Sequence, residues 1–261
     1  MLTIRRLALC AAAIAWVAPA AITAQTDTFP AERGEIRITP FASASVQLEW
    51  LGVVIHVDPW GGRGDYSQAR QANVILVTDT SGDHLDPAQI ELLRTPSTTV
   101  ILSSTPEDAR DEAGADRLRQ IRGAEVMNND ERRVIDFSSI GTPPITIESV
   151  AMYDIIPGQP FHAKGEGNGY IVTLGGVRIY LSGVTECTPE FQAVQDVDIA
   201  FVPMNLPNGR MPPTDAADCI KIIDPDVVYP YHYREQPIDV FIDALADESI
   251  DIRLHDWYPP A

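Results

Sequence analysis

This chain has little positive charge, few cysteines and only one long apolar run. Each shortage excludes some classes of partner, covalent cross-link or membrane segment. Lysine and arginine together number 19 against 37 aspartates and glutamates, which gives a formal net charge of −18. So acidic a chain disfavours nucleic acid and anionic membranes as partners, because both carry negative charge. A small-molecule substrate or ligand is therefore the expected partner.

The one long apolar run lies at the start of the chain. Residues 1–24 combine a basic beginning (Arg5 and Arg6), an apolar stretch (Leu7–Val17) and a series of small residues. This pattern is typical of a secretory signal peptide, and the run is too short for a good membrane span. We expect export to the periplasm or to the outside of the cell. No membrane-spanning segment is expected after the signal peptide is cleaved.

Only three cysteines are present, and Cys10 falls inside the expected signal peptide. The other two, Cys187 and Cys219, could form a disulfide in an oxidising compartment. Two buried free thiols are an equal alternative, because the sequence does not show whether the two Cα atoms approach each other.

The remaining residues, 25–261, contain neither a repeat nor a low-complexity tract, and their number fits one α/β domain. We expect residues 25–34 to form a polar, mobile lead-in. Helices are predicted for Leu85–Arg94, where Pro87 suits the first turn, and from Thr105 to about Arg122. Short β-branched, apolar runs predict strands at Ile36–Thr39, Ser45–Trp50, Val53–Asp58, Val74–Thr78, Thr98–Leu102, Ile145–Tyr153, Gly169–Leu174, Val177–Leu181, Ile199–Pro203 and Val227–Tyr231.

Side chains that can bind a metal gather where one of these strands ends. Val74–Thr78 leads directly into a loop that holds Asp79, Asp83 and His84 around Gly82. Such a junction fixes side chains on a rigid platform while leaving them open to solvent. Aspartate and histidine are both common ligands of first-row metals. The loop is therefore the first candidate for a functional site.

Polar residues also follow other predicted strands. His162 and Lys164 come after the strand that ends near Tyr153, and His232 comes directly after Val227–Tyr231. An α/β sheet commonly builds its site at such strand ends. A lone histidine there is more often a structural, hydrogen-bonded residue, so the shared arrangement is what indicates a site. We interpret the other two histidines differently, His56 as structural and His255 as a surface residue.

These motifs, in the same order along the chain, resemble those of the metallo-β-lactamase-fold hydrolases. The loop Thr78-Asp-Thr-Ser-Gly-Asp-His84 is similar to the family signature Thr-His-x-His-x-Asp-His. Asp58-Pro59, the His162 segment and the His232 segment resemble further family motifs, and Phe201–Pro207 resembles the ascorbate-lactonase branch. The resemblance implies an α/β fold that is a four-layer αββα sandwich over residues 25–261.

The family holds two metal ions, and the resemblance places their ligands here. The ligands of the second ion would be Asp83, His84 and His232, and all three are present. The ligands of the first ion would be Asp79, Ser81 and His162. A serine hydroxyl is a poor zinc ligand beside imidazole or carboxylate. The set of donors for the first ion is therefore weak.

The family's bridging aspartate corresponds to Val184, which cannot coordinate a metal. Two divalent ions close together need an anionic bridge to offset their repulsion. We therefore expect one metal ion, zinc or another divalent cation, on Asp83, His84 and His232. Three protein ligands with one open position describe a catalytic zinc site.

Two functions remain open from the sequence. The preferred one is exported, metal-dependent hydrolysis of a small ester, lactone or phosphoester. In it, Asp79 would orient or deprotonate the attacking water, His162 would polarise the substrate carbonyl, and Lys164 would hold an anionic substrate group. The alternative is a non-catalytic protein of the same fold that binds a ligand without metal chemistry, because Ser81 and Val184 replace donors in two separate motifs.

Overall fold

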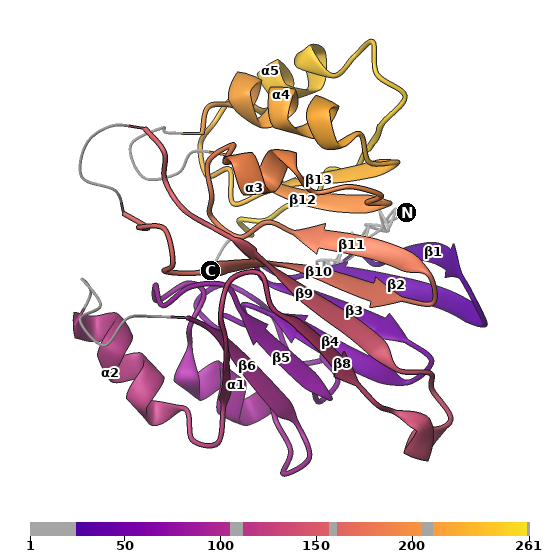
Figure 1. The fold of residues 1–261 in the computed structure, drawn as a ribbon, viewed down its shortest axis with the longest axis vertical. Coiled ribbons are helices and arrows are strands. Elements are labelled where there is room, and N and C mark those ends of the chain that lie inside the picture. The colour runs from indigo at the N-terminus through magenta and orange to yellow at the C-terminus, as the bar shows by residue number, and fades with distance from the viewer. Residues whose placement is uncertain (1–24, 105–111, 157–160, 205–210, 260–261) are drawn as a thin grey trace, which may run out of the picture.

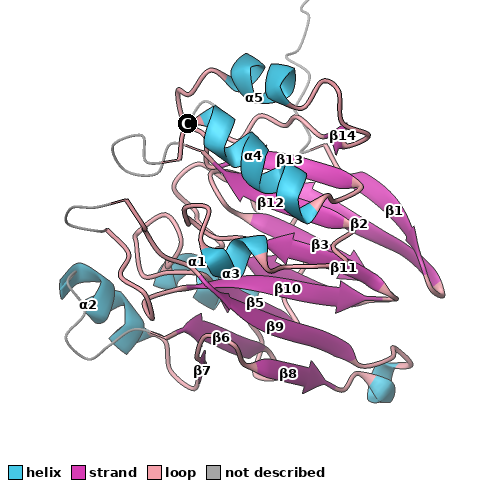
Figure 2. Ribbon diagram, turned by 45° about the horizontal axis from the view of Figure 1, so that its top comes forward, coloured by secondary structure: helices cyan, strands magenta, loops and turns pink. Residues whose placement is uncertain are grey.

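The computed structural model describes residues 25–104, 112–156, 161–204 and 211–259. Two seven-stranded sheets face each other, and helices cover the outer face of each (Figures 1 and 2). This is the predicted αββα sandwich. The expected signal peptide and the beginning of the helix predicted from Thr105 lie outside the described residues. Among the described residues, no helix is long and apolar enough to span a membrane.

The first sheet follows the chain in order from β1 to β7. Neighbouring strands are antiparallel up to β4 and parallel from β4 onward. Its strands are β1 (Asp27–Ala31), β2 (Gly34–Pro40), β3 (Val46–Trp50), β4 (Val53–Val57), β5 (Val74–Val77), β6 (Thr99–Ser103) and β7 (Glu125–Met127).

The second sheet repeats this plan in the order β14 to β8. Strands β8 to β11 pair antiparallel, and β11 to β14 pair parallel. Parallel neighbours require crossover connections, which is where the helices of each half occur. The strands are β8 (Arg132–Ile135), β9 (Ile145–Ala151), β10 (Asn168–Leu174), β11 (Val177–Leu181), β12 (Ile199–Pro203), β13 (Val227–Tyr231) and β14 (Asp251–Ile252).

Helices α1 (Pro87–Leu93) and α2 (Glu112–Gln120) cover the first sheet. The second sheet is covered by α3 (Pro189–Gln192), α4 (Pro213–Ile223) and α5 (Ile238–Ala244). Helix α1 begins as its sequence predicts, with a proline in the first turn and Asp86 accepting the N–H groups of Ala88 and Gln89. A short 3₁₀ helix, Ser138–Ile140, connects β8 to β9.

The main core lies between the two sheets. Ile38 and Leu48 of the first sheet and Tyr170 and Phe201 of the second are fully buried there in one apolar cluster. One further apolar cluster lies between each sheet and the helices that cover it. The central parallel strands β5, β12 and β13 are therefore buried on both faces, which is why their sequences read as continuous apolar runs instead of alternating ones.

The expectation of a mobile lead-in at residues 25–34 is wrong, since β1 and the start of β2 occupy this segment. The Asp27 carboxylate accepts hydrogen bonds from Tyr229 Oη at 2.6 Å and His255 Nε2 at 2.8 Å. We call Asp27, Tyr229 and His255 the terminal clasp. The interpretation of His255 as a surface residue is also wrong. Its side chain is 6% exposed and stacks on Tyr229.

The remaining local predictions have mixed outcomes. Two-residue turns join β3 to β4 and β10 to β11, with positive φ at Leu51 and Gly52 and at Gly175 and Gly176, as tight hairpins require. The short outer strands β7 and β8 were not predicted from the sequence. His56 is structural as predicted, being buried with Nε2 bonded to the carbonyl of Arg70 at 2.8 Å.

A disulfide joins Cys187 and Cys219, whose Cα atoms lie 5.8 Å apart. It links the segment after β11 to α4. This finding decides between the two alternatives that the sequence left open for these cysteines.

Candidate metal centre

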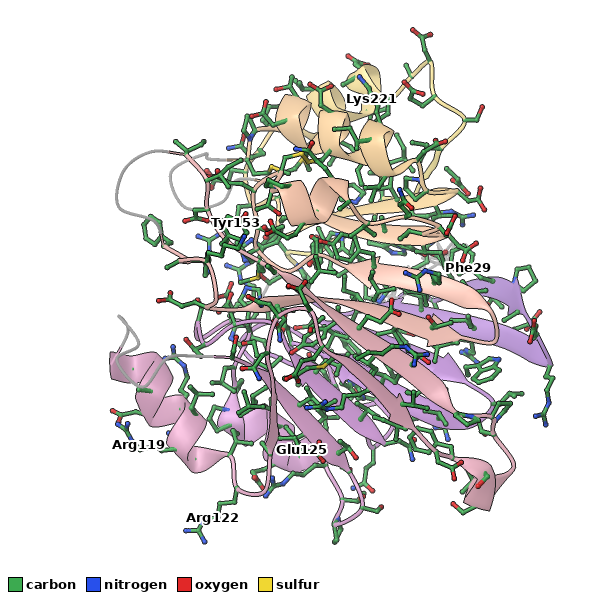
Figure 3. The ribbon with its side chains drawn as sticks, viewed as in Figure 1. Phe29, Arg119, Arg122, Glu125, Tyr153 and Lys221 are labelled. Carbon is green, nitrogen blue, oxygen red and sulfur yellow. A yellow bond between two sulfur atoms is a disulfide. The ribbon has the colours of Figure 1, made fainter. Side chains whose placement is uncertain are left out.

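Polar side chains converge where β4, β5, β9 and β13 end. Asp58 directly follows β4, the loop that begins at Thr78 follows β5, and His232 directly follows β13. Tyr153, just after β9, lies at one end of the sandwich, and Phe29 of β1 lies at the other (Figure 3). The ends of strands from both sheets thus build one site between them.

Asp83, His84 and His232 form a compact group of potential metal ligands, called the donor group below. One ligand atom from each residue lies within 4.8 Å of the other two. His232 Nε2 is 3.2 Å from Asp83 Oδ2, and the two imidazole rings are 5.2 Å apart between centroids. Both histidines are buried, while Asp83 is partly exposed. The structure therefore brings the adjacent residues Asp83 and His84 together with His232, which lies 149 positions from Asp83 in the sequence.

A carboxylate behind His84 fixes the orientation of its ring. Asp58 Oδ2 lies 2.8 Å from His84 Nδ1. The same carboxylate accepts the backbone N–H of Thr78 at 2.7 Å and its hydroxyl at 2.6 Å. Because Nδ1–H donates to Asp58, the ring presents Nε2 to the donor group. Such carboxylate–histidine pairs orient metal-binding imidazoles in proteins. The sequence signal for Asp58 was only the Asp-Pro pair after β4.

Ser43 supports the other two members of the donor group. Its hydroxyl donates to Asp83 Oδ2 at 3.2 Å, and its carbonyl accepts the backbone N–H of His232 at 3.1 Å. Ser43 and His232 both adopt the left-handed region, with φ of 55° and 48°. Non-glycine residues are held in this region only where surrounding contacts enforce it, often at functional sites. Sequence reasoning missed Ser43, because no motif marks it.

His162 lies between two carboxylates beside the donor group. Its Nε2 is 3.5 Å from Asp79 Oδ2, and its Nδ1 is 3.6 Å from Asp154 Oδ1. Asp154 also accepts the backbone N–H groups of Phe161 at 2.7 Å and His162 at 3.2 Å. Asp79 is in turn 3.8 Å from His84 Nε2. The structure thus places Asp79 and His162 next to the donor group. Asp154 was also missed from the sequence.

The carboxylates and imidazoles of the site alter each other's proton affinity. Burial opposes the charged form of His84, but the carboxylates of Asp79, Asp58 and Asp83 outweigh it and raise its pKa to about 10. The pKa of His162 is likewise raised, to about 9, since Asp154 and Asp79 outweigh the effect of burial. The same pairs, against burial, hold the pKa values of Asp79 and Asp83 well below their usual range.

His232 differs from the other two histidines of the site. Burial lowers its pKa, and the neighbouring charge of His84 adds to this effect against the pull of Asp83. Its ring is therefore neutral at pH 7 and ready to coordinate a cation, because only a neutral imidazole can act as a metal ligand.

The chemistry of the donor group fits one divalent cation. Two imidazoles and one carboxylate are ligands that zinc and other first-row metals accept. Beside them, Asp79 Oδ2 is buried and has no hydrogen-bond partner among the described residues, although two histidines face it. Such an atom is what a site suited to a cation or a water would present.

The side chains of Val184 and Ser81 supply no strong metal ligand. Val184 is buried in the apolar cluster beneath α3, α4 and α5, and its backbone N–H faces Met152 Sδ at 3.1 Å. At Ser81, the backbone N–H donates to Asp79 Oδ1. Valine offers no donor atom and a serine hydroxyl is a weak one, so among the described residues the compact donor set is Asp83, His84 and His232.

Lys164 has an ionic partner of its own. Its ammonium group pairs with the Glu190 carboxylate and lies 5.0 Å from the centre of the Tyr153 ring. Tyr153 Oη donates to the same carboxylate at 2.6 Å. An anionic substrate group at Lys164 would therefore have to compete with Glu190.

Comparison with known proteins identifies the family. Residues 37–232 match the sequence profile of the Beta-lactamase superfamily domain. This chain therefore belongs to the beta-lactamase superfamily, and it is a member of the metallo-β-lactamase-fold hydrolases. The matched range contains the whole site and ends at His232.

Individual relatives agree with this assignment. A crystal structure from Parabacteroides distasonis, named as a candidate metal-dependent hydrolase, is 34% identical, with a TM-score of 0.75 over 88% of this chain and 98% of that one. A metal-dependent hydrolase of Aeropyrum pernix is 24% identical over 77% of this chain and 84% of its own length. A metallo hydrolase from Ignicoccus hospitalis, 20% identical with a TM-score of 0.64 over 84% of this chain and 94% of that one, shares the fold.

Proposed function

We propose that this chain is an exported, metal-dependent hydrolase of a small ester, lactone or phosphoester, with one divalent cation held by Asp83, His84 and His232. The observation that carries the proposal is the donor group itself, with three ligand atoms within 4.8 Å of one another. Zinc is the proposed metal, because it accepts imidazole and carboxylate ligands and keeps one position open in catalytic sites. The metal-dependent hydrolases among the relatives support the reaction class.

A divalent cation bound there supplies Lewis acidity for the substrate oxygen and makes a water molecule more acidic. Asp79 is the base of this proposal. Its carboxylate is buried and ionised, and its Oδ2 is directed toward both neighbouring histidines. It accepts the proton that the attacking water loses.

His162 is the proposed hydrogen-bond donor to the oxygen that gains negative charge. With a pKa raised to about 9, its ring is protonated at pH 7. A charged N–H that is fixed before the reaction stabilises developing negative charge without reorganisation. Asp154 holds the ring from behind, so it positions His162 and does not itself contact the substrate.

Export to the periplasm is supported by two features. One is the signal-peptide pattern of residues 1–24. The other is the Cys187–Cys219 disulfide, since disulfides persist mainly in oxidising compartments.

Metal content and hydrolysis measured on the same preparation test the proposal. We expect about one equivalent of zinc per chain, and turnover of a panel of esters, lactones and phosphoesters that a chelator abolishes. His232→Ala and Asp83→Ala should lose metal and turnover together, whereas Asp65→Ala, which removes an exposed carboxylate, should lose neither. Protein that binds ligands in the presence of chelator but turns none over would instead be a non-catalytic binding protein.

A further inference from the structure

Three exposed apolar side chains stand beside the site, on the segments next to Asp154 and His162. Ile155, Ile156 and Phe161 are 48%, 44% and 52% exposed. Scattered exposed apolar residues are ordinary in soluble proteins, but exposed apolar residues that lie together beside a site are typical of a ligand-binding surface. We propose that this apolar rim, Ile155, Ile156 and Phe161, binds the apolar acyl group of an uncharged ester or lactone while the bond is hydrolysed. This inference rests on the proposed function.

Backbone hydrogen bonds fix the rim next to the catalytic groups. The N–H of Asp154 donates to the carbonyl of His162 at 3.0 Å, which brings the two segments together. The N–H of Phe161 donates back to the Asp154 carboxylate at 2.7 Å. Ile155 directly follows Asp154 in the sequence, and Phe161 directly precedes His162. Both apolar residues are therefore next to this hydrogen-bonded pair. Since His162 faces Asp79, the rim begins one residue away from the proposed reacting groups.

A buried carboxylate holds one side of the rim in place. Glu186 Oε2 accepts the N–H of Ile155 at 2.8 Å and that of Ile156 at 2.7 Å, and the Glu186 side chain is buried. These bonds fix the backbone of Ile155 and Ile156, whose side chains remain exposed to solvent. A surface prepared in this way loses little conformational entropy when it binds an apolar group.

The rim side chains themselves carry no charge, so the part of the substrate that rests on them is apolar. Charges of both signs surround the reacting groups, since His162 lies between the carboxylates of Asp79 and Asp154, and Arg234 faces Asp83. The Lys164 ammonium group is paired with Glu190, so it offers no free cation to an anionic acyl chain. A neutral carboxylic ester with an apolar acyl chain therefore suits the rim.

The reaction that follows is ordinary ester hydrolysis. The oxygen of water bonds to the carbonyl carbon, and Asp79 receives the proton that this water loses. The bond between the carbonyl carbon and the alkoxy oxygen then breaks, and the leaving oxygen takes up the proton. The products are a carboxylic acid, whose chain rests on the rim, and an alcohol.

The test compares chain lengths with the metal-loaded protein. We expect kcat/KM for 4-nitrophenyl octanoate to exceed that for the acetate by about tenfold or more. Phe161→Ser and Ile155→Ser should reduce this ratio toward one. Val134→Ser, which removes an exposed apolar side chain from β8, is the matched control and should leave the ratio unchanged. An octanoate-to-acetate ratio that is the same in the parent and the rim variants would overturn the proposal. So would faster hydrolysis of an anionic phosphodiester than of the octanoate.

Failure of the proposed function gives a different result from failure of the rim. If neither ester is hydrolysed, the hydrolase proposal is wrong, and binding of the neutral fluorophore N-phenyl-1-naphthylamine then tests the rim alone. Weaker fluorophore binding by Phe161→Ser, with unchanged binding by Val134→Ser, would support an apolar binding site. Equal binding by all three proteins would refute it.

Discussion

Asp58 Oδ2 lies 2.8 Å from Nδ1 of His84, and each of these side chains is only 1% exposed. Asp58 ends the hairpin formed by β3 and β4, while His84 belongs to the loop after β5. The contact therefore fixes His84 of the donor group relative to the end of β4 in the first sheet. It also fixes which nitrogen of His84 remains available for a metal.

Replacing Asp58 by asparagine tests this role. We expect Asp58→Asn to lower the affinity for zinc by about 10- to 100-fold, the usual effect of losing a carboxylate behind a metal-binding histidine. Calorimetric titration with zinc measures the effect. Asp65→Asn, which changes an exposed carboxylate, is the control. Unchanged zinc affinity in Asp58→Asn would mean that His84 does not need this partner.

Metal binding should release protons. The pKa of His84 is raised to about 10, so its ring is protonated at pH 7, and a metal at Nε2 must displace that proton. We expect about one proton released per metal bound, and an affinity that rises about tenfold per pH unit between pH 6 and 9. Calorimetry in buffers of different ionisation enthalpy measures the proton directly. An affinity independent of pH in this range would contradict the assignment of His84 as a ligand.

His56 should make the fold sensitive to acid. Burial lowers its pKa to about 4, against about 6.5 for an exposed histidine. Above pH 6.5 both the folded and the unfolded chain hold this ring neutral. Below it only the unfolded chain takes up a proton. The free energy of unfolding should therefore fall by up to about 3 kcal/mol between pH 6.5 and 4.

Denaturant unfolding at a series of pH values measures this loss. In His56→Gln, whose amide can still donate to the carbonyl of Arg70, the part of the pH dependence due to His56 should disappear. If the parent and the variant lose stability in parallel over this pH range, other groups account for the acid sensitivity.

Val184 should not tolerate replacement by a carboxylate. It is buried in the apolar cluster beneath α3, α4 and α5. We expect Val184→Asp to lower the free energy of unfolding of the metal-free protein by about 3 kcal/mol or more, because a buried carboxylate lacks partners there. Val126→Asp, at an exposed position of β7, is the matched control. Equal stability of the two variants would show that the surroundings of Val184 accommodate a carboxylate.

The fold was predictable because most strands have a clear local sequence pattern. β5, β10 and β12 are β-branched, apolar runs bounded by turns, and burial on both faces preserves that pattern. β1 was not predictable, because it is held by Tyr229 and His255, which lie more than 200 positions away. β8 alternates between exposed and half-buried positions at a sheet edge, so its apolar signal is weak.

The site was predictable only in part, and for a similar reason. Asp83 and His84 stand in one recognisable loop, and His232 follows a strong strand. Ser43 contributes through its backbone carbonyl and a left-handed conformation, and neither leaves a trace in the sequence. Asp154 acts through a contact with His162 that depends on how the chain returns after β9.

The terminal clasp has a practical consequence for the connectivity of the chain. Because Asp27 and His255 are hydrogen-bonded, the two ends of the domain meet at one place. Domains with adjoining ends tolerate circular permutation when new ends are opened at an exposed turn. A short linker from the residues after Tyr258 to those before Asp27, with new ends at the exposed turn of Gly123, should give a permuted chain. In such a chain β7 and the second sheet precede β1 to β6 along the sequence, while the site stays at the junction between the two sheets.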